Sequence, residues 1–151
     1  NYGSIKKYHN NYIGFNNRMD EIQAAFLLEK LKDLNSINKK KILIAKIYDK
    51  YLSSKFIKPK IDNFNNVFHI YPIRVKKRNK FIKYLNKINI PFNIHYPIPP
   101  HKQKALSSFF KNKKFPITEE IHKTTISLPI ATYYSKKQIE KFCIKINKFY
   151  D

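Results

Sequence analysis

The sequence predicts an α/β protein, a small α+β domain in which helices alternate with about three strands. Three observations support this class. Several segments space apolar residues three and four positions apart, as one face of a helix requires. Short stretches rich in β-branched and aromatic residues lie between these segments. The chain has 151 residues, 42% of them hydrophobic, which is enough to bury a core of its own.

Two helices are predicted in the first third of the chain. Over residues 20–34 the apolar positions follow helical spacing and predict one buried stripe. These positions are Ala24, Leu27, Leu28, Leu31 and Leu34. Asn17 or Asp20 is placed to cap the start of this helix. A second helix is predicted over 38–52 and must end before Pro59. Its core-facing positions are Ile44, Ile47, Tyr48 and Tyr51.

Strands and helices alternate in the middle of the chain. Residues 67–75 predict a strand, and Pro72 within it predicts an edge position because proline cannot donate to a ladder. Helical spacing returns over 78–87, with Phe81, Ile82 and Leu85 facing the core. A short strand is predicted over 92–95. The proline-rich segment 97–100 then stiffens the chain.

The last third of the sequence ends in a strongly marked helix. Before it, short helices are predicted near 103–110 and 118–125, followed by a third strand over 126–130. Ser135 and Gln138 have the spacing of a capping box, which predicts a helix start. The buried stripe of this final helix is Ile139, Phe142, Cys143 and Ile146.

The net charge is strongly positive. Lysine and arginine total 31 against 10 acidic residues, a net charge of +21, and such a balance ordinarily indicates a polyanionic partner. Only Arg18, Arg74 and Arg78 are arginine, the residue that base readout and bidentate phosphate contacts favour. We therefore attribute much of the charge to compositional drift, in which an adenine- and thymine-rich coding strand places lysine at tolerant surface positions. A gathering of lysines on one face of the folded chain would contradict this hypothesis. No apolar run approaches the ~20 residues of a membrane span.

Two stretches carry polar groups suited to a ligand. Residues 1–25 bring amide, hydroxyl and guanidinium groups to the start of a helix, where backbone N–H groups favour an anion. Residues 95–103 form a proline-stiffened loop that displays His95, Tyr96 and His101. Structural interpretations stay open for both stretches: a capped turn for the first, and a rigid surface turn with a partly packed tyrosine for the second.

Metal and nucleophilic chemistry have little support in the sequence. No carboxylate or thiol lies near His95 and His101 along the chain, so no metal site is predicted. The other histidines are scattered: His9, His69 and His122. Ser127 has no histidine or acid at a recognisable spacing, and Cys143 lies on an apolar stripe, so neither is predicted as a nucleophile. With only two glycines, phosphate-loop fingerprints are excluded.

Several short motifs follow one another along almost the whole chain. They are Tyr2-Gly3-Ser4, Lys7-Tyr8, Gly14-x-Asn16-x-Arg18-Met19-Asp20-Glu21-x-Gln23-Ala24-Ala25, Lys30-Leu31, His95-Tyr96-Pro97 to His101-x-Gln103, and Ser127-Leu128-Pro129. Together they resemble the carboxy-terminal portion of the DegT/StrS family of PLP-dependent nucleotide-sugar aminotransferases. The resemblance implies the C-terminal small domain of a fold-type-I PLP enzyme. Residues 1–19 would form the loop that crosses the dimer interface, and 20–151 the small domain with its two leading helices.

The resemblance also implies roles for individual residues. Asn16 and Arg18 would hold the PLP phosphate of the neighbouring subunit. The substrate-side residues would be Lys7 and Tyr8 near the nucleotide diphosphate, and Tyr96 and His101 near the sugar. The family's Schiff-base lysine precedes the Tyr-Gly-Ser motif, so no catalytic residue is assigned in this chain. The fragment alone is expected neither to bind PLP nor to be active.

For the full-length relative, the resemblance implies a cytoplasmic homodimer that transfers an amino group from an amino acid, usually glutamate, to a keto-sugar nucleotide. Two other interpretations stay open. The charge, together with 11 Tyr and 12 Phe that could stack on bases, suits a small nucleic-acid-binding module. Against it, most of the aromatic residues fall on the periodic apolar stripes. Alternatively, the helix over 20–34 exposes its apolar surface and associates with another copy of the chain.

Overall fold

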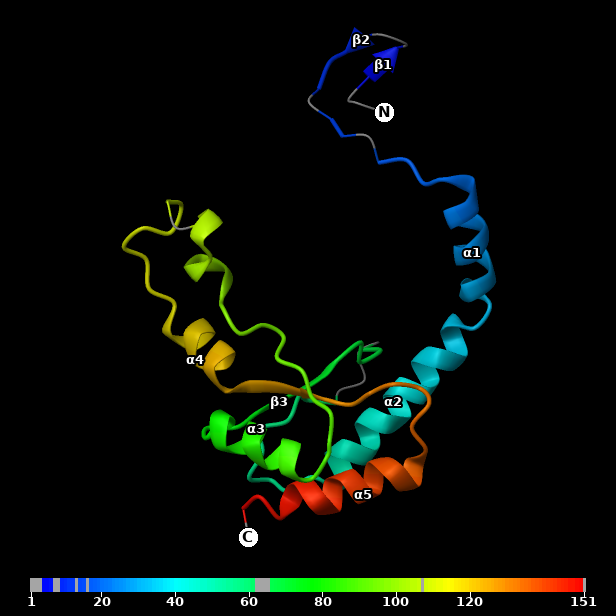
Figure 1. Cartoon of the computed structure of the whole chain (residues 1–151). Coiled ribbons are helices and arrows are strands. Elements are labelled where there is room, and N and C mark those ends of the chain that lie inside the picture. The colour runs from blue at the N-terminus through cyan, green and yellow to red at the C-terminus, as the bar shows by residue number, and fades with distance from the viewer. Residues whose placement is uncertain are drawn as a thin grey trace. The chain divides into compact units, whose positions relative to one another are not determined.

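The chain folds as two compact units, Asn1–Ser36 and Ile37–Asp151. The computed structural model describes residues 4–6, 9–12, 14–15, 17–61, 66–106 and 108–150 (Figure 1). None of the helices in these described segments is long and apolar enough to cross a membrane.

The first unit holds a short hairpin and one helix. Strands β1 (Ser4–Lys6) and β2 (His9–Asn10) pair antiparallel; segments this short carry no alternation, and the sequence did not predict them. Helix α1 (Glu21–Leu31) forms where the periodicity placed it. The expected buried stripe is wrong, because no residue of α1 is buried and Leu28 is 66% exposed. Asp20 takes the N-cap position, but its side chain makes no capping hydrogen bond.

The core of the second unit forms between three helices and a strand pair. Helices α2 (Leu34–Tyr51), α3 (Arg78–Lys87) and α5 (Lys136–Asn147) contribute their apolar faces. Figure 1 shows α3 and α5 on the same side of the strands. At the centre, the rings of Tyr48 and Tyr71 stack at 4.9 Å, and burial raises the pKa of both hydroxyls. The aromatic residues of this unit are therefore largely occupied with packing.

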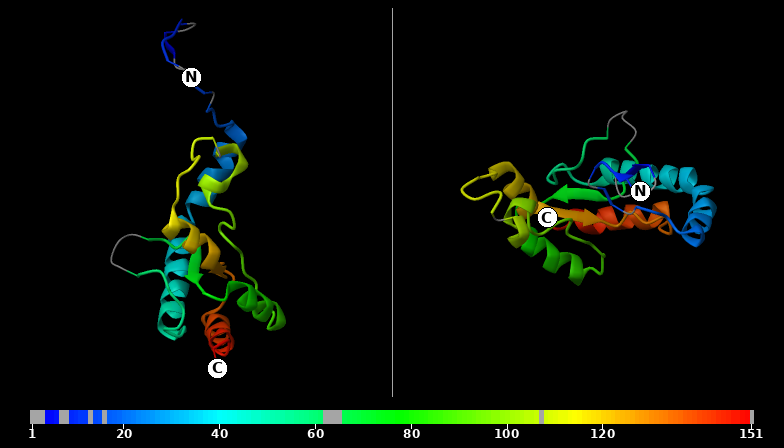
Figure 2. Two further views of the ribbon diagram at one scale, coloured as in Figure 1. Left: turned by 90° about the vertical axis from the view of Figure 1, so that its left-hand side faces the viewer. Right: turned by 90° about the horizontal axis from the view of Figure 1, so that it is seen from above.

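The sheet is smaller than the sequence indicated. Strands β3 (Tyr71–Arg74) and β4 (Thr125–Leu128) pair antiparallel, with Tyr71 opposite Leu128. Pro72 lies in a two-stranded sheet, where every strand is an edge, as predicted. The strand expected over 92–95 is a single bridge, in which Asn93 pairs with Ser127 of β4. Figure 2 shows the strand pair from two further directions.

The helices of the second unit follow the predicted order with one correction. Helix α4 (Pro116–Thr124) forms near the expected place. The helix predicted over 103–110 is instead two short 3₁₀ turns, Pro100–Lys102 and Lys104–Leu106. The α5 capping box is present in both directions. Cys143 is fully buried on α5, and burial raises its thiol pKa to about 12, consistent with an inert core residue.

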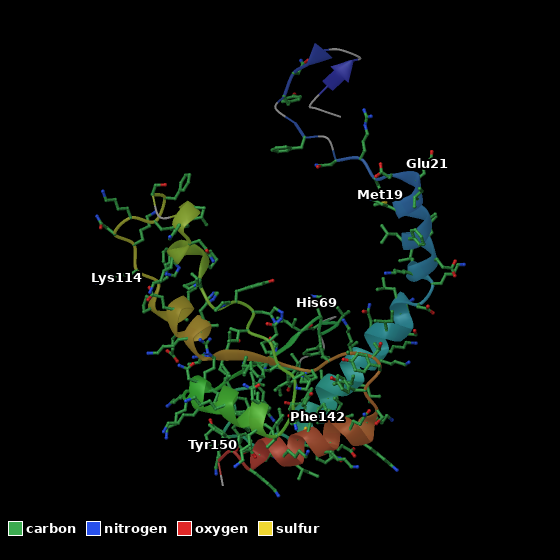
Figure 3. The ribbon with its side chains drawn as sticks, in the orientation of Figure 1. Met19, Glu21, His69, Lys114, Phe142 and Tyr150 are labelled. Atoms are coloured by element: carbon green, nitrogen blue, oxygen red, sulfur yellow. The ribbon has the colours of Figure 1, made fainter. Side chains whose placement is uncertain are left out.

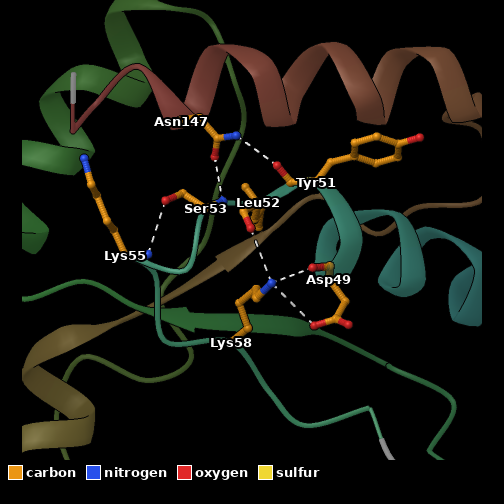
Figure 4. Close-up of polar contacts among 7 residues, drawn as sticks. All are labelled: Asp49, Tyr51, Leu52, Ser53, Lys55, Lys58 and Asn147. Carbon is orange, nitrogen blue, oxygen red and sulfur yellow. Dashed lines mark hydrogen bonds and ion pairs between the residues drawn. The ribbon is translucent and has the colours of Figure 1, made fainter.

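Polar contacts join the end of α2 to α5 (Figure 4). The Asn147 amide nitrogen donates to the Tyr51 carbonyl at 2.9 Å, and its Oδ1 accepts from the Ser53 backbone N–H at 2.9 Å. Because the last carbonyls of a helix lack intrahelical partners, this side chain acts as a C-terminal cap. Tyr51 itself is exposed, contrary to its predicted core position. Phe142 and Tyr150, labelled in Figure 3, pack around the same core.

Candidate functional site

The predicted site residues fall in two separate places. Lys7, Tyr8 and Asn16 lie outside the described residues. Arg18 is described and exposed, two residues before Asp20, the N-cap residue of α1, whose side chain makes no capping hydrogen bond. Tyr96 and His101 lie in the second unit: Tyr96 is between the Asn93 bridge and the first 3₁₀ turn, and His101 is within that turn.

The Tyr96 segment is anchored to β4 by a histidine that joins two polar side chains. His95 Nδ1 lies 2.9 Å from the Ser127 Oγ, and its Nε2 lies 3.1 Å from the Asn93 amide nitrogen. Ser127 therefore does have a histidine partner, contrary to the sequence prediction. The partner was invisible in the sequence because 32 residues separate the two, and only the bridge at Asn93 brings them together.

Tyr96 projects outward from this anchor. The Tyr96 side chain is 67% exposed, while its backbone carbonyl accepts a hydrogen bond from His122 Nδ1 on α4 at 2.6 Å. A carbonyl can only accept, so the proton lies on His122 Nδ1. A cavity of about 460 Å³ opens beside the ring. Its lining, largely apolar, includes Tyr96, Pro97, Ile98, Gln103, Leu106 and His122.

His101 occupies a different environment from Tyr96. Its side chain is only 8% exposed, and Nε2 contacts the Glu119 carboxylate at 3.2 Å. The ring packs 4.8 Å from that of Phe115. Hydrogen bonds from Lys102 and then His101 lower the pKa of the Glu119 carboxyl. These contacts attach the first 3₁₀ turn to α4. His101 therefore stabilises the loop from its buried side, while the Tyr96 side chain is exposed.

A cationic hollow adjoins the Tyr96 cavity. It has a volume of about 720 Å³, shares Pro97, Ile98 and His122 with that cavity, and adds Arg78, Lys102 and Lys123. Its two carboxylates are already engaged: Glu119 pairs with Lys102, and Glu120 with Arg74. An apolar cavity beside cations suits a ligand that joins a ring to an anionic group. The described residues bring together no group of three or more His, Cys, Asp or Glu side chains that could hold a metal ion.

Lysines also gather at the start of α3. A third hollow, of about 300 Å³, is lined by Lys76, Lys77, Arg78, Asn79, Lys80 and Lys123, with no carboxylate among them. Arg78 is itself structural, because its guanidinium donates to the carbonyls of His122 and Thr125. At this place the positive charge is locally concentrated, which counts against drift as its whole explanation.

The residues that sequence reasoning missed are the ones that fix the Tyr96 loop in place. Asn93 and His122 carry no motif of their own, and His122 was set aside as one of several scattered histidines. The sequence feature that could have indicated them is the position of His95 next to the exposed Tyr96. A polar side chain such as His95 needs a hydrogen-bond partner once it is partly buried.

Comparison with known proteins identifies the class to which this fold and loop belong. The chain superposes on DesV of S. venezuelae with a TM-score of 0.85 at 27% identity, covering 99% of this chain and 41% of that one. An aminotransferase from Brucella abortus gives 0.84 at 29%, covering 98% and 40%. NtdA from Bacillus subtilis, solved with bound cofactor PMP, gives 0.80 at 25%, covering 95% and 36%. The fold is thus the α+β portion of an aminotransferase.

The sequence comparisons then give the family. The model of the DegT/DnrJ/EryC1/StrS aminotransferase family matches residues 1–147, and the chain belongs to that family. A dTDP-3-amino-3,6-dideoxy-alpha-D-galactopyranose transaminase of Aneurinibacillus thermoaerophilus is 43% identical over 99% of this chain. A UDP-2-acetamido-2-deoxy-3-oxo-D-glucuronate aminotransferase of Pseudomonas aeruginosa is 30% identical over 94%. The chain spans about two fifths of their lengths, 41% and 40%.

Proposed function

We propose that this chain is the carboxy-terminal portion of a PLP-dependent aminotransferase that transfers an amino group from an amino acid, usually glutamate, to a keto-sugar nucleotide. The observation that carries the proposal is the family match over residues 1–147 in a chain that spans two fifths of its relatives. PLP, when bound, supplies the electron sink for this transfer. The division into a 1–19 loop and a 20–151 domain, the cytoplasmic location and the homodimer belong to the same proposal.

Arg18 and Asn16 are the residues that we assign to the cofactor phosphate. Arg18 is exposed, and α1 begins beside it without a side-chain cap, so its first backbone N–H groups have no side-chain acceptor at the cap. A guanidinium next to such a helix start suits a phosphate dianion. Asn16 is assigned by family resemblance alone. The described geometry at Arg18 therefore fits the phosphate group of PLP.

The substrate side is assigned to the second unit and the start of the chain. Tyr96 supplies an exposed ring beside a largely apolar cavity. His101 supports the same wall through its contact with Glu119. Lys7 and Tyr8 are assigned to the nucleotide diphosphate by resemblance. No residue is assigned the chemical step, which the remaining part of the enzyme would supply.

A first test mixes the chain with PLP and traps any cofactor–lysine linkage with borohydride. We expect no transamination and no absorbance from a cofactor-linked lysine. Of the 31 basic residues three are arginine, and we expect no preferred site of PLP attachment among the other 28, the lysines. A PLP adduct at one unique lysine would overturn the assignment of this chain as a portion without the catalytic lysine.

A second test asks whether the chain can complete a relative. Residues 1–151 replace the matching part of the Aneurinibacillus transaminase, and amino transfer is measured. We expect activity, with a loss of about tenfold or more in Arg18→Lys because a lysine cannot grip phosphate bidentately. Arg74→Lys is the matched control, since Arg74 pairs with Glu120 on the second unit. Equal activities in the two variants would contradict the role of Arg18.

A further inference from the structure

We propose that His95 is a positioning residue, held as the tautomer with its single proton on Nδ1, and that it fixes the loop presenting Tyr96. The hydrogen bonds on both ring nitrogens carry this inference. Its consequence for substrate binding rests on the proposed function, whereas the tautomer itself does not.

The first step is the orientation of the Asn93 amide. The backbone N–H of Ile94 donates to Asn93 Oδ1 at 2.8 Å. This contact identifies the amide oxygen, because the amide nitrogen carries only donors and could not accept from Ile94. The group that faces His95 is therefore the amide NH₂.

The second step places the proton on the imidazole. Asn93 Nδ2 lies 3.1 Å from His95 Nε2, and since the amide nitrogen donates, Nε2 must accept and carries no proton. A neutral ring then has its proton on Nδ1, which donates to the Ser127 Oγ at 2.9 Å. The opposite tautomer would set two donors against each other at Nε2.

The third step is the rigidity of the two anchors. Asn93 and Ser127 exchange backbone hydrogen bonds, at 3.1 Å from the Asn93 N–H and 2.8 Å from the Ser127 N–H. Ser127 is 4% exposed. The imidazole thus bridges two side chains whose backbones are already fixed to each other, which fixes the ring as well.

This arrangement excludes a nucleophilic pair. A serine nucleophile needs a base with a free lone pair facing its hydroxyl, and Nδ1 of His95 faces Ser127 with a proton instead. The next residue, Tyr96, is held by a second contact, because its backbone carbonyl accepts a hydrogen bond from His122 Nδ1 at 2.6 Å. With the backbone fixed at both residues, the Tyr96 ring stays exposed. His95 therefore acts through Tyr96 and not on a substrate directly.

The test is long-range ¹H–¹⁵N NMR on the 151-residue chain labelled in its five histidines. We expect His95 to show a protonated Nδ1 and an unprotonated Nε2. Its signals are identified by their disappearance in His95→Asn, which distinguishes them from those of His122, whose Nδ1 is also protonated. A His95 signal with the proton on Nε2 would overturn the proposal. The tautomer is read from the wild-type chain, and the variant serves only to assign the signal.

A pair of variants sharpens the measurement. Asn93→Asp places a carboxylate oxygen against Nε2, so we expect His95 to gain a proton there at the same pH. Asn86→Asp, an exposed change on α3, is the matched control and should leave the His95 signals unchanged. An unaltered His95 spectrum in Asn93→Asp would contradict the inferred contact.

Titration with dTDP-glucose separates this inference from the proposed function. A shift of the Tyr96 amide signal is expected if the loop lies on the substrate side. If no shift is seen while His95 keeps its proton on Nδ1, the substrate role of the loop is wrong and the inferred tautomer stands. If the shift is seen with the proton on Nε2, the proposed function stands and the positioning role of His95 is wrong.

Discussion

Helices α1 and α5 are nearly equal in length, with 11 and 12 residues, yet their apolar stripes lie in opposite environments. On α5 the residues Ile139, Cys143 and Ile146 are completely buried. On α1 no residue is buried, and its leucines lie open. The start of α5 carries a complete capping box, whereas Asp20 at the start of α1 makes no capping hydrogen bond.

The contrast shows what amphipathic periodicity can and cannot establish. The spacing of apolar residues identifies the face of a helix that favours burial, because that spacing follows from 3.6 residues per turn. The spacing does not identify the surface that covers this face, because that surface depends on which other segments of protein are present. The curated relatives are more than twice as long as this chain, which covers 41% of the Aneurinibacillus transaminase. An unpartnered α1 is in keeping with the proposed assignment.

The largest expected effect comes from deleting one apolar side chain on each helix. Ile139→Ala on α5 opens a cavity in a packed core and should lower the free energy of unfolding by about 2–5 kcal/mol. Leu28→Ala on α1 removes a side chain that is already solvated and should change it by less than about 0.5 kcal/mol. Urea unfolding followed by near-ultraviolet circular dichroism measures both. Similar losses in the two variants would show that α1 is packed in solution.

The helices show how far sequence could predict the fold. Periodicity placed α1, α2 and α3 because each presents a continuous stripe, and the Ser135–Gln138 spacing placed the start of α5. The strand over 92–95 was wrong because backbone pairing is a property of two segments, and only Asn93 meets β4. The helix over 103–110 became 3₁₀ turns, in a segment stiffened from Pro97 onward.

The candidate site was less predictable than the fold. The 95–103 loop was identified because its residues are contiguous in sequence. The roles within it were not, because exposure divides them: Tyr96 faces outward, while His101 is enclosed against Glu119. Ser127 gained a histidine partner that only the sheet register could supply. Residues whose partners are distant in sequence show no characteristic spacing from which their roles could be predicted.

The second prediction concerns the caps of the two helices. Ser135→Ala removes the acceptor of the Gln138 N–H and should destabilise the chain by about 1 kcal/mol. Asp20→Ala should have a much smaller effect, because Asp20 makes no capping bond. Thermal unfolding of both variants in the same buffer compares them. Equal shifts in Tm would contradict the difference in capping, and Ser135→Thr, which keeps the acceptor, should restore most of the stability.

A smaller effect is expected from Glu119, which lies in the second unit but near its surface. Lys102 and His101 hold the pKa of the Glu119 carboxyl below its usual value, so the carboxylate stabilises the folded state above the unfolded pKa. That contribution is lost as pH falls through the lowered pKa. Glu119→Gln should therefore reduce Tm at neutral pH and converge with the wild type in acid. Melting curves between about pH 3 and about pH 7 test this, and a constant difference would contradict it.

The smallest change in stability is expected where the apolar stripe of α1 is made polar. Leu28→Ser with Leu31→Ser should leave the free energy of unfolding within about 0.5 kcal/mol of the wild type, because both side chains are already exposed. The same change should reduce self-association in sedimentation experiments, since it breaks a contiguous apolar patch. Ile144→Ser on α5 is the matched control: Ile144 is an apolar residue that is 61% exposed, on a helix whose Ile139, Cys143 and Ile146 are buried. If Ile144→Ser lowered association as much as the α1 variant, the exposure of single apolar residues would govern association. The continuous exposed stripe of α1 would then have no special role.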